Sequence, residues 1–88
     1  MANGFYNKIQ TDSRVCATHI SLYFALLDEQ GLYADHVIRL KPAIIMLKAK
    51  ISSRVTYNKR MRELHLYGFI SYVPSFTPGE SLVRMIAL

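Results

Sequence analysis

The segment from Ile51 to Ile70, ISSRVTYNKRMRELHLYGFI, limits the fold of this chain more than any other stretch. It predicts a helix that begins after Ser53, whose side-chain oxygen is suited to accept a hydrogen bond from a first-turn amide. Three apolar residues of that helix, spaced by four and three, share one side. They are Tyr57, Met61 and Leu64. We expect this side to face the protein interior.

A second register of the same helix, with Val55 turned inward, is less favourable. It would bring Asn58 or Lys59, and then Arg62, into the core, and burying an unpaired charge costs several kcal/mol. The first register is therefore preferred, with Val55 left at the edge of the core. The residues then expected on the opposite, solvent-facing side are Arg54, Thr56, Asn58, Lys59 and Arg60.

Positive charge is concentrated in the middle third of the chain, which has a net charge of +5 overall. Residues 37–62 carry eight Lys and Arg and no acid, whereas residues 1–36 carry two cations and four acids. Eight uncompensated cations repel one another, so a fold that keeps them together most often presents them to a polyanion. The alternative is a solvated surface that only keeps the protein in solution.

Length and composition predict a single domain over residues 1–88, because 88 residues with 51% hydrophobic content build one core. The uncharged stretches 15–27 and 64–79 have thirteen and sixteen residues, fewer than the roughly 20 that a membrane-spanning helix needs. The N-terminus, MANGFYNKIQ, lacks the apolar run of a secretory signal. We therefore expect a cytoplasmic protein without a membrane segment.

Turn and capping residues divide the rest of the chain. Gly31 suits a helix stop, Pro42 suits the first turn of a helix, and Gly68 suits the end of the basic helix. The expected elements are helices over 15–30, 42–50 and 54–67, a short strand over 36–40, and strands over 69–73 and 82–86. Residues 74–81 form a turn-rich loop that joins the last two strands into a hairpin. The first helix is apolar on more than one face, which predicts deep burial or a shared partner surface.

This order of elements resembles bacterial winged-helix DNA-binding proteins, including MarR-like repressors and small DNA-binding domains of plasmid and mobile-element replication or regulatory proteins. In that family a Ser opens the recognition helix, a Thr follows, and a Leu, a Gly and an Ile lead into the wing. The matching residues here are Ser53, Thr56, Leu64, Gly68 and Ile70. The resemblance implies an α+β winged helix-turn-helix fold, with three helices, a short first strand and a C-terminal β-hairpin wing. The turn 48–51 departs from the pattern because it has no glycine.

The resemblance and the charge distribution together predict sequence-specific binding of double-stranded DNA through the third helix, in a transcriptional regulator or a mobile-element replication or regulatory protein. A helix about 10 to 12 Å across fits the major groove. Arg54 suits guanine and Asn58 suits adenine, while Ser53 and Thr56 suit a base or a phosphate. Phosphate contacts are expected from Lys48, Lys50, Lys59, Arg60 and Arg62.

The alternative function is a winged-helix protein-interaction or dimerisation module that does not bind DNA, because a fold does not fix a function. A homodimer fits either function, since paired domains read half-sites one helical turn apart. His19, His36 and His65 lack the spacing of a zinc site. No catalytic dyad or glycine-rich phosphate loop is present, so we expect no enzyme activity, no cofactor and no small-molecule substrate.

Overall fold

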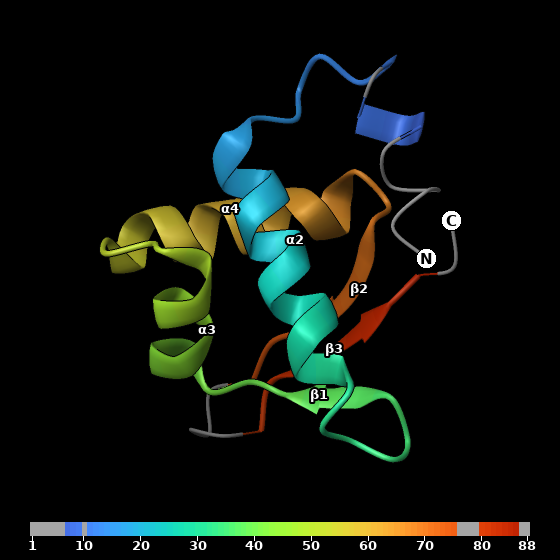
Figure 1. Ribbon diagram of the computed structural model, residues 1–88, viewed down its shortest axis with the longest axis vertical. Helices are drawn as coiled ribbons and strands as arrows, with labels where there is room; N and C mark the ends of the chain where they lie inside the picture. The colour runs from blue at the N-terminus through green and yellow to red at the C-terminus, as the bar shows by residue number, and fades with distance from the viewer. Residues whose placement is uncertain (1–6, 10, 76–79, 87–88) are drawn as a thin grey trace.

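A computed structural model describes residues 7–9, 11–75 and 80–86 of the chain. Its elements, labelled as in Figure 1, are α2 (Ala17–Gln30), β1 (Val37–Arg39), α3 (Pro42–Ala49), α4 (Arg54–Leu66), β2 (Ile70–Val73) and β3 (Leu82–Met85). Residues 7–9 and 11 are also helical, which adds a fourth helical segment to the three helices expected from the sequence. The expected α+β class and the expected helices and strands are confirmed, each to within two residues at the ends that the structure describes.

The three strands form one antiparallel sheet in the order β1-β3-β2. β3 lies in the middle, with Val37 of β1 opposite Arg84 and Ile70 of β2 opposite Met85. The short strand expected over 36–40 pairs with the last strand of the chain. Part of the expected loop over 74–81 lies outside the described residues.

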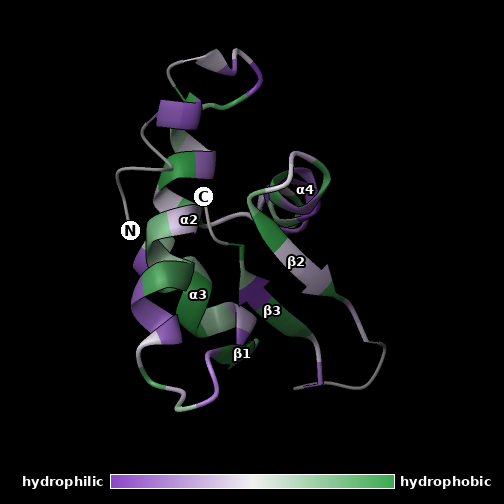
Figure 2. Cartoon of the chain, turned by 90° about the vertical axis from the view of Figure 1, so that its right-hand side faces the viewer, coloured by the Kyte–Doolittle hydropathy of each residue, from purple (hydrophilic) through white to green (hydrophobic). Residues whose placement is uncertain are grey.

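α2 is the central helix, since it packs against α3, α4, β1 and β3. Its apolar faces are used inside the domain, with Leu22 and Leu26 fully buried. Gly31 follows the helix as expected, but with φ −63° it does not use the left-handed freedom of glycine. In Figure 2 the helix α4 is viewed nearly along its axis, with the hairpin of β2 and β3 beside it. None of the helices in the described ranges has both the length and the apolar character of a membrane span.

The turn between α3 and α4 shows how the chain manages without glycine. Lys50 adopts the left-handed conformation, with φ 61°, that glycine usually supplies after a helix. The amide of Ile51 then donates to the carbonyl of Met46 at 2.9 Å, and the Ile51 side chain is buried. This closes the end of α3 and directs the chain into α4.

α4 has the register expected from its apolar spacing. Ser53 is the N-cap, and its hydroxyl oxygen accepts a hydrogen bond from the Thr56 amide at 3.2 Å. The buried residues of the helix are Tyr57, Met61 and Leu64. They belong to an apolar core that also includes residues of α2 and of the sheet. Each large apolar side chain buried in this way stabilises the fold by about 1.5 to 3 kcal/mol.

Candidate nucleic-acid interface

The side of α4 opposite the core carries four exposed residues spaced by four, three and four. They are Val55, Lys59, Arg62 and Leu66, and we call them the outer ridge. Val55 is 78% exposed, which corrects the expectation that it lies at the edge of the core. At about 1.5 Å per residue the ridge is roughly 16 Å long. It places two cations between two aliphatic side chains.

The four residues predicted to read bases divide between the first turn and the flank of the helix. Ser53 and Arg54 are exposed, while Thr56 and Asn58 are half-buried. The guanidinium carbon of Arg54 lies 5.9 Å from the centroid of the Tyr57 ring. Because no carboxylate in the described ranges pairs with Arg54, its hydrogen-bond donors stay available to a ligand.

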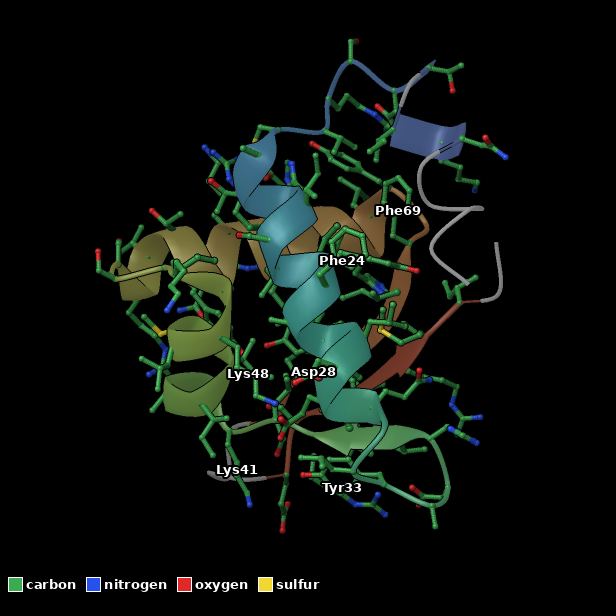
Figure 3. All side chains as sticks on the ribbon, viewed as in Figure 1. Phe24, Asp28, Tyr33, Lys41, Lys48 and Phe69 are labelled. Carbon is green, nitrogen blue, oxygen red and sulfur yellow. The ribbon has the colours of Figure 1, made fainter. Side chains whose placement is uncertain are left out.

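Lys48, predicted to contact phosphate, is held by α2 instead of being free. Its Nζ atom lies 2.7 Å from Asp28 and 2.8 Å from Glu29, and Figure 3 shows the side chain directed toward Asp28. Hydrogen bonds to these carboxylates raise the pKa of Lys48. Glu29 is only 3% exposed, so Lys48 compensates a nearly buried negative charge.

Arg60, also predicted to contact phosphate, takes part in a network that joins α4 to α2. It donates to Glu63 at 2.7 Å, and the same carboxylate oxygen is 2.7 Å from Nε2 of the buried His19. Nδ1 of His19 accepts from the Cys16 amide at 2.9 Å, so Nε2 is the protonated nitrogen that donates to Glu63. The hydrogen bond from Arg60 is the main reason that the pKa of Glu63 is lowered.

The middle third is therefore less uncompensated than its sequence suggests. Arg39, Lys48 and Arg60 each have an acid partner that lies outside residues 37–62. Within the described part of the chain, the cations of this segment with no ion pair are Lys41, Lys50, Arg54, Lys59 and Arg62. Four of these five lie on α4 or in the turn that leads into it. Folding thus pairs some cations of the segment with acids, and most of the cations left unpaired lie on α4 or just before it.

A hollow of about 570 Å³ lies beside the outer ridge, between α4 and the start of the hairpin loop. Its lining residues are Asn58, Arg62, His65, Tyr72 and Pro74. The amide of Tyr72 donates to Nδ1 of His65 at 3.0 Å, which ties the end of α4 to β2. Arg62 belongs to both the ridge and the hollow, and its Nε donates weakly to the Asn58 carbonyl at 3.4 Å. The two surfaces therefore form one continuous face.

The sequence did not identify Leu66 or the hollow as part of this face, and it placed Val55 at the edge of the core. The helical spacing could have identified Val55 and Leu66, because they lie four residues before Lys59 and four residues after Arg62. The prediction of the site considered only polar and charged residues. The hollow depends on where β2 packs, which no local signal gives. In the residues that the structure describes, no group of three or more His, Cys, Asp or Glu side chains is arranged to hold a metal ion.

Comparisons of the chain with protein-family models, with curated proteins and with solved structures find no match.

Proposed function

We propose that this protein binds double-stranded DNA sequence-specifically, with α4 in the major groove, as a winged helix-turn-helix domain of a transcriptional regulator or a mobile-element replication or regulatory protein. The order of elements supports the proposal. α3 and α4 are joined by a short turn, and the β2-β3 hairpin follows α4 and pairs with β1. This is the arrangement that the resemblance to winged-helix proteins implies.

The observation that carries the proposal is the contrast between the two sides of α4. One side is fixed in the core by Tyr57, Met61 and Leu64. The other side and the preceding turn hold Lys50, Arg54, Lys59 and Arg62 without carboxylate partners in the described ranges. An anchored helix with free cations on its outer face matches the width and the charge of the major groove.

The roles of the residues follow from their partners. Arg54 is the candidate guanine reader, because its donors are unengaged and a guanidinium bonds guanine O6 and N7 together. Lys50, Lys59 and Arg62 are the candidate phosphate contacts. We leave Lys48 and Arg60 out of the contact set, since each is already neutralised by a carboxylate and releasing it would leave that acid unpaired. Thr56 and Asn58 lie on the flanks, where they contact DNA only at the groove edge.

A fluorescence-polarisation titration of a random duplex tests the DNA-binding function. Three phosphate contacts predict that log K falls against log salt with a slope of roughly −3. Arg39→Gln is the control, because Arg39 is paired with Asp35 and lies away from α4. The absence of binding at low salt, or binding that does not respond to salt, would contradict the proposal.

Sequence reading is tested separately by Arg54→Ala. Loss of a bidentate contact to guanine weakens binding to a preferred site by about 1 to 3 kcal/mol and leaves random duplex nearly unaffected. Equal losses on both kinds of duplex would assign Arg54 to phosphate and remove its reading role.

A protein-interaction or dimerisation module is the second candidate, and one observation favours it. Leu47 is 73% exposed and Ile44 is 40% exposed on α3, so this helix offers apolar surface away from the core. Sedimentation equilibrium of the protein and of Leu47→Ser separates the two functions when combined with the titration. Self-association that Leu47→Ser abolishes, together with no DNA binding, supports the second candidate.

A further inference from the structure

We infer that Val55 contacts the C5 methyl group of thymine in the major groove, and so adds an apolar base contact to the hydrogen bonds of Arg54. The inference rests on the proposed DNA-binding function. It concerns which bases α4 selects and not whether it binds.

Folding gives no reason for the position of Val55. Its 78% exposure is the highest among the large apolar side chains described, and it is not one of the residues that pack on the core. A β-branched residue is also a weaker helix former than Ala, Lys or Gln on an exposed helix surface. The domain therefore keeps an apolar side chain in solvent where a polar one would serve the helix better.

The neighbours of Val55 indicate what covers it. It lies in the first turn of α4, directly after Arg54 and four residues before Lys59 on the outer ridge. When Lys59 and Arg62 contact phosphates, the first turn is the part of the helix that points at base edges. A valine there has no donor or acceptor to offer.

The chemistry of the groove leaves few partners for such a side chain. Each base pair presents donors and acceptors in the major groove, and the C5 methyl of thymine is the apolar group among them. Val55 against a polar base edge would remove that edge from water without replacing its hydrogen bonds, which is unfavourable. Val55 thus favours thymine and disfavours the other base edges.

Leu66 provides a matched control on the same ridge. It is 77% exposed and aliphatic, but it lies eleven residues further along α4, at the end away from the first turn. An apolar contact made by the first turn of α4 depends on Val55 and not on Leu66. A general apolar contribution of the ridge depends on both residues.

The test uses the duplex that the wild-type protein selects from a random library of about 20 base pairs, enough for two half-sites. The selected duplex is compared with versions in which one thymine at a time is replaced by uracil, which lacks only the methyl group. At one thymine in each half-site, uracil is expected to weaken wild-type binding about fourfold, the factor that corresponds to burying one methyl group. Val55→Ala is expected to bind both duplexes equally, and Leu66→Ala to discriminate like the wild type.

The outcomes separate the inference from the proposed function. The inference is overturned if uracil has no effect at any position or if the selected motif contains no thymine. It is also overturned if Val55→Ala still discriminates between the duplexes or if Leu66→Ala no longer does. In each of these cases salt-sensitive binding would still support DNA binding. No binding of any duplex by the wild type would overturn both. Circular dichroism of the two variants checks that the helices are intact.

Discussion

The inner side of α4 and its outer ridge belong to one helix, but the first is buried in the core and the second is exposed to solvent. Tyr57, Met61 and Leu64 are at most 2% exposed and hold the helix in the core. The outer ridge adds nothing to that core and sets two cations between two aliphatic residues in solvent. Among the residues of the outer ridge, which do not contribute to the core, Lys59, Arg62 and Val55 are the ones to which we assign a DNA-binding role.

The cations of the chain show the same contrast. Lys48 and Arg60 are bound to carboxylates and serve to connect α3 and α4 with α2. Lys59 and Arg62 have no such partners in the described ranges. Removing the charge of a paired cation and removing that of an unpaired one should therefore have different effects on DNA affinity.

The largest effect is expected for a pair of leucines two residues apart on α4. Leu64 is fully buried and Leu66 is 77% exposed. Leu64→Ala should destabilise the protein by about 2 to 5 kcal/mol through lost burial and a cavity, while Leu66→Ala should stay within about 0.5 kcal/mol. Urea denaturation followed by circular dichroism measures both. Similar losses for the two variants would mean that the ridge is covered by the protein itself.

The second effect concerns DNA affinity. The double variant Lys59→Gln/Arg62→Gln should make the salt slope shallower by about 2, close to one phosphate contact for each residue. Lys48→Gln should leave the slope unchanged, because that cation is already paired. Titration of a random duplex at several salt concentrations measures the slopes. A larger change for Lys48→Gln would reverse the assignment of free and paired cations.

A smaller, stabilising effect is expected on the inner side. The hydroxyl of Tyr57 is buried and has no hydrogen-bond partner among the described residues. Burial also raises the pKa of Tyr57 to about 12. Tyr57→Phe removes the unsatisfied group without changing the ring, so the free energy of unfolding should rise by about 1 kcal/mol. A loss of stability in the same urea experiment would show that the hydroxyl is bonded in solution.

The smallest effect is expected for Glu63→Gln. The pKa of Glu63 is lowered from its ordinary value of 4.5, so the ionised carboxylate stabilises the fold at pH values above 4.5. This contribution is lost as the pH falls through the folded-state pKa. The Gln oxygen still accepts from His19 and Arg60, so the change at neutral pH should be under about 1 kcal/mol. Urea midpoints from pH 7 down to about pH 3 should fall less in the variant than in the wild type. Parallel curves would contradict the assigned network.

The sequence predicted those parts of the fold that depend on local spacing. The register of α4 followed from Ser53 and three apolar residues, and the start of α3 followed from Pro42. The pairing of β1 with β3 was not predictable, because it joins segments from opposite halves of the chain.

The candidate site was predicted only in outline. Which cations are neutralised depends on contacts such as Lys48 with Asp28 and His19 with Glu63, which are 20 and 44 residues apart in sequence. Charge counting along the chain cannot detect such pairs. Val55 was placed at the core edge because sequence patterns treat an aliphatic residue as buried by default.

The most direct test of the central claim is an NMR titration of the ¹⁵N-labelled protein with a random duplex at low salt. If the outer side of α4 is the DNA-binding face, the largest shift changes will fall on the amides of residues 50–62 and on the side chain of Arg54. The amides of α2 near Asp28 should remain almost unchanged. Changes centred on α2 or on Ile44 and Leu47 of α3, or no changes at all, would contradict the account.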